Sequence, residues 1–214
     1  LNPYALLCGV LSVAMLAMHG AAWLIVKTTG PVQERARRFG TWAAIATLVL
    51  YALGGLLLWA FIDGYVVTST FPENGPSNPL AKTVEVYAGG WFTNYGAHPW
   101  MLIAPAAGFV GALGVLGMIA AKREVGVLML SQLSIFGVIS SVGLSMFPFI
   151  LPSSEMPGAS ITVWDSSSSH LTLFIMLVTS VVFLPIIALY TTWAYKLLWG
   201  KVKKEDVTGD SHAY

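Results

Sequence analysis

The sequence predicts an all-α fold, a polytopic membrane helix bundle with five transmembrane helices, its N-terminus outside and its C-terminus in the cytoplasm. Three observations lead to this prediction. Hydrophobic residues fill 56% of the 214 positions and charged residues only 10%, and the mean hydropathy is +0.73; soluble proteins carry about 25% charged residues. Five apolar runs each approach the roughly 20 residues that a helix needs to cross a bilayer. Nearly all basic residues fall on one side of these runs.

Composition and pattern also exclude several other classes of protein. The formal net charge of +1 argues against a nucleic-acid binder, which would carry a basic face. Cys8 is the only cysteine, which excludes an internal disulfide and a cysteine-ligated metal cluster. The apolar runs do not alternate in polarity as the strands of a membrane barrel do, and a helix satisfies its own backbone in lipid. We therefore expect a single transmembrane region over 1–214.

The elements follow from these runs in chain order. Short turns join the first run to the second and the third to the fourth, whereas long segments rich in Gly, Pro, Asn and Ser follow the second and the fourth. We expect the spans at about 4–26, 41–62, 99–121, 125–147 and 171–195.

Orientation follows from the basic residues. With five spans, only Lys82 lies on one side of the membrane, and the positive-inside rule makes the other side cytoplasmic. The ten residues on that side are Lys27, Arg35, Arg37, Arg38, Lys122, Arg123, Lys196, Lys201, Lys203 and Lys204. The sequence begins at Leu1, which is not a methionine, and its odd number of spans places its N-terminus outside. We therefore expect the chain to be the C-terminal part of a longer subunit.

Small residues recur inside the third and fourth spans. Ala104, Gly108 and Ala112 stand at four-residue spacing, and Gly137 lies in a serine-rich fourth span. Small residues allow close helix approach in lipid, where van der Waals contact drives packing. We expect bundle packing here, with a ligand groove as the alternative. Prolines 105 and 185 are expected to kink their spans.

The two outer segments, 63–98 and 148–170, contain apolar and aromatic residues. Loops of this kind usually pack against something. We expect them to fold as a cap over the chain's own helices, with docking onto a partner subunit as the alternative. Residues 78–87 are expected to form a short interfacial helix.

Titratable residues offer little chemistry inside the spans. All carboxylates lie at span ends or in loops, which argues against a transporter or pump acting through this chain alone. His19, the only histidine well inside a span, is expected to make a hydrogen bond between packed helices; the alternative is a functional group facing a cavity or a quinone. The only conceivable pair for haem ligation is His98 with His170, which we expect instead to be polar span-end residues. No catalytic or metal-binding residue is predicted.

Two aspartates remain. Asp63 follows a helix C-terminus, which repels negative charge, so it needs a compensating partner; we expect a structural latch or, as the alternative, an outer-face contact with a cofactor-bearing neighbour. His19 and Asp63 are the weak candidates for cofactor binding. Asp165 and the four serines after it precede the last span, and Asp165 or a following serine can accept hydrogen bonds from the first N–H groups of that helix; we expect Asp165 to be the cap.

Two long motifs stand in the outer segments, IDGYVVTSTFPENGPSNPLAKTV at 62–84 and MFPFILPSSEMPGASITVWDSSSSHLTL at 146–173. They resemble subunit II of the cytochrome bd-type quinol oxidases of bacterial and archaeal respiratory chains. The opening NPYALLCGV and the closing LYTTWAY fit the C-terminal half of that subunit, so the resemblance covers essentially the whole chain.

This resemblance implies a complex in the cytoplasmic (inner) membrane that oxidises a quinol and reduces oxygen to water. Subunit I of the family carries the haems b and d, and subunit II is a haem-free partner that supports it in the lipid bilayer. Proton-path residues are expected in the first half of subunit II, outside this sequence. Some members hold a structural quinone, which no motif here places, and a small single-helix subunit is a further candidate partner. The alternatives are half of a membrane transporter or channel, and a membrane cytochrome.

Overall fold

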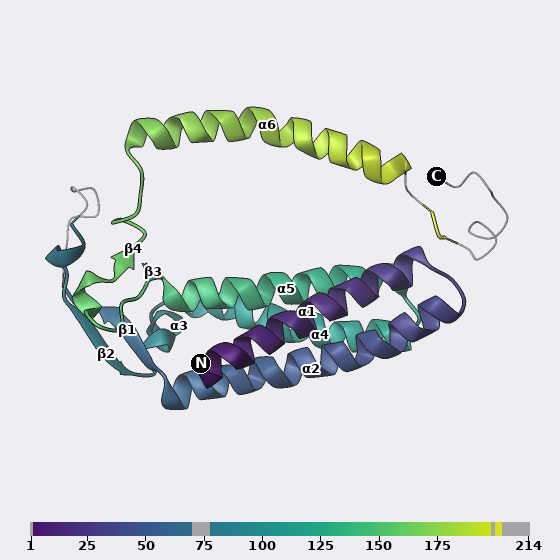
Figure 1. The fold of residues 1–214 in the computed structure, drawn as a ribbon, viewed down its shortest axis with the longest axis horizontal. Coiled ribbons are helices and arrows are strands. Elements are labelled where there is room, and N and C mark those ends of the chain that lie inside the picture. Colours follow the sequence, from purple (N-terminus) through teal and green to yellow (C-terminus); the bar gives the residue numbers. More distant parts are fainter. Residues whose placement is uncertain (1, 70–77, 198–199, 203–214) are drawn as a thin grey trace.

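The computed structural model describes residues 2–69, 78–197 and 200–202 (Figure 1). It confirms five helical segments long and apolar enough to cross a membrane. They are α1 (Pro3–Lys27), α2 (Pro31–Phe61), the short 3-10 helix η3 (Pro99–Leu102) with α4 (Ile103–Ala120), α5 (Glu124–Met146) and α6 (His170–Leu197). The expectations for Lys203 and Lys204, and the middle of the first outer segment at 70–77, lie outside the described residues.

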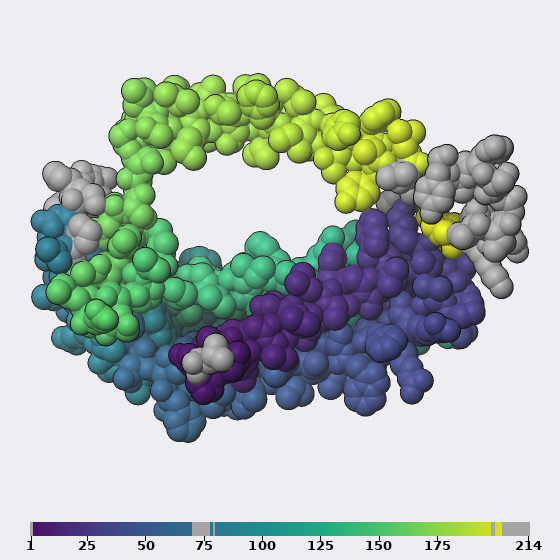
Figure 2. Space-filling view, in the orientation of Figure 1, coloured from purple at the N-terminus to yellow at the C-terminus, as the bar shows by residue number. Residues whose placement is uncertain are grey.

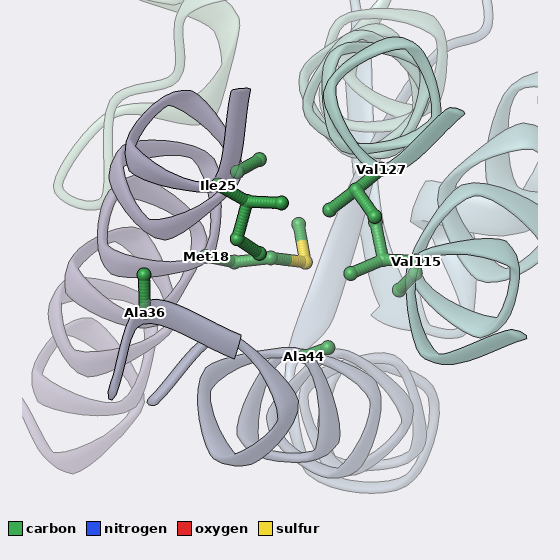
Figure 3. Packing of buried hydrophobic residues seen from close by; sticks show 8 residues of the cluster. Met18, Ile25, Ala36, Ala44, Val115 and Val127 are labelled. Carbon is green, nitrogen blue, oxygen red and sulfur yellow. The ribbon is translucent and has the colours of Figure 1, made fainter. Parts of the chain in front are cut away.

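Helices α1, α2, α4 and α5 lie side by side in one four-helix bundle (Figure 1). One end of the bundle carries the turns at 28–30 and 121–123, and we call it the basic end. The opposite end carries two small β-hairpins, and we call it the hairpin end. Near the basic end all four helices contribute to one apolar core, in which Met18, Ile25, Val115 and Val127 are fully buried (Figure 3).

Helix α2 begins at Pro31, ten residues before the expected start of the second span. Gly30 adopts a positive φ of 66° and Pro31 takes the first helical position, where a missing N–H breaks no hydrogen bond. The basic residues at 35–38 are therefore helical rather than part of a turn. Hydropathy marks where a helix enters lipid, and this helix continues beyond that point.

Small residues bring α4 and α5 together, as the sequence predicts. A Cβ atom at Gly137 would overlap the backbone of Gly108, and one at Gly111 would overlap the backbone of Ser134. The Ser134 hydroxyl donates a hydrogen bond to the Gly108 carbonyl at 3.0 Å. These glycines thus allow backbone contact between the two helices, which is the main source of attraction in lipid.

The prolines have a smaller effect than expected in the third span. Pro105 lies in the first turn of α4, where its lost N–H is not part of the helical ladder, and the 3-10 helix η3 leads into that turn. Pro185 lies inside α6, which is bowed rather than straight (Figure 1).

At the hairpin end the chain forms strands where an interfacial helix was expected. Strand β1 (Asp63–Val67) pairs antiparallel with β2 (Val84–Ala88), with Tyr65 opposite Val86. The expectation of a helix over 78–87 is wrong: only a 3-10 turn, η1 (Pro79–Ala81), precedes β2. Alternating β-branched residues favour a strand once a partner is available, and β1 supplies it.

The second outer segment forms a smaller hairpin, β3 (Phe149–Leu151) with β4 (Ile161–Thr162), which lies beside the first (Figure 1). Trp91, in the 3-10 turn η2 (Gly90–Phe92), packs its ring against Tyr65 of β1 and Phe149 of β3, with ring centroids 5.4 and 6.3 Å apart. A short helix, α3 (Thr93–Ala97), then leads to η3. The outer segments therefore fold together over one end of the bundle, as expected.

Helix α6 stands apart from the other four. Across its described length no residue is buried, and Figure 2 shows an opening between α6 and the bundle. It approaches the bundle near the basic end, where the rings of Tyr195 and Trp23 lie 6.0 Å apart. The segment after it returns to the turn between α1 and α2, where the Val202 N–H donates to the Lys27 carbonyl at 2.8 Å.

Candidate functional site

His19 lies on the side of α1 that faces α5. Its Nδ1 is 2.9 Å from the hydroxyl oxygen of Ser131, which is fully buried on α5. The Ser131 hydroxyl donates its own proton to the Leu128 carbonyl at 2.7 Å, so the Nδ1 atom of His19 is the donor in the bond between the helices. The contact is a hydrogen bond between packed helices, as expected for His19; its alternative role beside a cavity or a quinone stays a prediction.

His98 and His170 lie on different elements at the hairpin end. His98 joins α3 to η3, and His170 is the first residue of α6. Both side chains are exposed, as expected for polar residues at span ends. Among the described residues, no three His, Cys, Asp or Glu side chains gather where they could hold a metal ion. His212 lies outside the described residues.

Asp63 opens β1 two residues after the end of α2. Its side chain is exposed, so solvent can stabilise its charge and a protein partner is not required. Both expected roles, the latch and the contact with a cofactor-bearing neighbour, stay predictions.

Asp165 does not cap the last helix, contrary to expectation, because α6 begins five residues later at His170. Ser169, directly before the helix, provides the hydroxyl that lies 3.4 Å from the Thr172 nitrogen. Asp165 instead forms an ion pair with Lys82, and its Oδ2 lies 2.8 Å from the Lys82 Nζ. The two side chains are only 9% and 2% exposed.

This ion pair joins the two outer segments. Oδ2 of Asp165 also accepts hydrogen bonds from the backbone and the hydroxyl of Thr162, at 3.0 and 2.7 Å. Burial raises the pKa of Asp165, but the hydrogen bonds from Lys82 and Thr162 outweigh it, so this pKa lies below its usual value. Lys82 is the one basic residue that the sequence places on the outer side of the membrane. This isolation is the signal that could have indicated an acidic partner.

A second polar cluster lies at the basic end around Glu124, and the sequence analysis did not anticipate it. Glu124 is the first residue of α5, a position where the helix dipole favours a carboxylate. Its carboxylate accepts hydrogen bonds from Gln33, at 2.8 Å, and from Lys201. Arg37 adds a longer ion pair at 3.6 Å. The cluster thus connects α2, α5 and the segment that follows α6.

These two clusters are the principal ionic contacts of the described chain, and both join segments distant in sequence. Neither lies in the middle of the bundle, where packing is mainly through apolar and small residues. The arrangement can hold helices and loops in place at either end.

Comparison with known proteins agrees with the motifs. The chain is 43% identical over 213 residues to the "Probable cytochrome oxidase subunit 2" of Haemophilus influenzae. It is 41% identical over 215 residues to the "Cytochrome bd-I ubiquinol oxidase subunit 2" of Escherichia coli K12. Both alignments cover 100% of this chain and 56% of the relative, so the chain spans about half the length of the curated relatives it matches.

The family described as cytochrome bd terminal oxidase subunit II matches residues 1–198. This range includes all five apolar helices, both hairpins and the Lys82–Asp165 ion pair. With a match of that extent, the chain belongs to the cytochrome bd terminal oxidase subunit II family.

Proposed function

We propose that this chain is a haem-free supporting part of a quinol:oxygen oxidoreductase in the cytoplasmic membrane. The complex oxidises a quinol and reduces oxygen to water, and its haems b and d lie in a partner, subunit I. The family match over residues 1–198 carries this proposal. Under this proposal, the chain has a structural role in the complex and supplies no catalytic residue.

The histidines of this chain fit a structural role better than haem ligation. A bis-histidine site needs two rings directed at one iron from opposite sides. His19 instead gives its Nδ1 proton to Ser131 within the α1–α5 contact, while His98 and His170 are exposed on separate elements. These residues do not fit a haem site, so no step of the reaction is assigned to them.

Membrane orientation is part of the same proposal. Lys27, Lys122, Arg123 and Lys196 all lie toward the basic end, and the positive-inside rule places such an end in the cytoplasm. The hairpin end then faces the outside. Cysteine scanning with a membrane-impermeant thiol reagent checks this: intact cells should label a cysteine placed at exposed Glu85 and not one placed at exposed Lys122.

Purification in mild detergent tests the proposal as a whole. A tag on this chain should recover a haem-bearing partner together with quinol-dependent oxygen consumption. The variants H98A and H170A should keep the haem absorption of the complex unchanged. Recovery without any haem-bearing partner would contradict the supporting role, and a Soret band that H98A removes would contradict the haem-free assignment.

A further inference from the structure

We draw no further inference here: the strongest candidate, the apolar face of α6 (His170–Leu197) that lies opposite the four-helix bundle, carries none, because the chain spans about half the length of the curated relatives it matches and nothing in the structure shows what covers that face.

Discussion

Substitution in the Lys82–Asp165 ion pair tests directly how the hairpin end is held together. Replacing Asp165 by Asn keeps the size and shape of the side chain and removes its negative charge. Lys82, only 2% exposed at its side chain, then remains as a buried cation without its carboxylate. We expect D165N to loosen the contact between the first outer segment and the β3–β4 hairpin.

The magnitude follows from the burial. Removing one partner of a buried ion pair costs about 3–5 kcal/mol. Asparagine still offers one oxygen to the Thr162 donors, and Asp165 is not fully buried, so we take the lower figure of about 3 kcal/mol. Because 1.4 kcal/mol corresponds to a factor of ten, local opening should become about one hundred times more frequent.

Hydrogen exchange of the intact complex measures this opening directly. The Thr162 amide donates to Asp165, and the Val163 amide donates to the Pro148 carbonyl at 2.9 Å. Protection of both amides should fall about one hundredfold in D165N by the same estimate. Amides in the middle of α5 should keep their protection, because that helix is held by contacts with α4.

The double variant K82M/D165L is the matched control. Replacing a buried ion pair by apolar residues of similar size is often neutral or stabilising, so protection of the Val163 amide, whose acceptor is the Pro148 carbonyl, should recover at least in part. The Thr162 amide is not a readout for this variant, because leucine at 165 removes its acceptor. A D165N protein with protection within threefold of the unaltered protein would refute the reasoning, since the pair would then contribute no more than an exposed one. Failure of the double variant to recover any protection would show that the loss comes from packing instead of charge.

The pH dependence has a definite sign. Because the pKa of Asp165 lies below its usual value in the fold, its contribution is fully present above the ordinary aspartate pKa of about 3.9. It is lost only as the pH falls through the lower value in the folded protein. Protection of the Thr162 amide, corrected for intrinsic exchange, should therefore stay constant between pH 8 and pH 5, and a decline within that range would contradict the assignment.

Three further predictions concern the bundle and its basic end. G137A should lower the melting temperature in detergent, because its Cβ overlaps Gly108 and overpacking costs about 1–3 kcal/mol; G143A, in open space on the same helix, should leave it unchanged or raise it. H19A should lower stability by about 0.6 kcal/mol, the average for a hydrogen bond between membrane helices, with no change in the haem spectrum of the complex. E124Q should weaken the Lys201 contact by about 0.2–1 kcal/mol, seen as faster exchange of the Val202 amide, and high salt should reduce the difference from the unaltered protein.

The transmembrane helices could be predicted from the sequence because lipid imposes a simple rule. Each span must be apolar for about 20 residues, and all five such runs form helices. The start of α2 was misplaced because hydropathy reports the lipid boundary and not the helix end. Gly30 followed by Pro31 is a typical start of a helix, so the signal was present in the sequence.

The hairpin end was harder to predict because its structure depends on partners distant in sequence. Residues 84–88 form a strand only because 63–67 lie beside them, about 20 positions earlier. Lys82 and Asp165 are 83 positions apart, and Lys201 and Glu124 are 77 apart. No local pattern encodes such a distance, so Asp165 was interpreted from its nearest helix, as a cap.

The same ionic contacts explain how α6 is positioned. In lipid, apolar helices gain no hydrophobic energy by meeting each other, and a single helix already satisfies its own backbone. The exposed apolar residues of α6 therefore neither draw it to the bundle nor destabilise it when it stands apart. We expect contacts near its two ends to hold it in place. They include the ion pair of Asp165 with Lys82 before the helix, and that of Lys201 with Glu124 after it. If this reasoning holds, combining D165N with E124Q should increase the range of distances between spin labels on α6 and α5 more than either change alone, while the bundle itself stays intact.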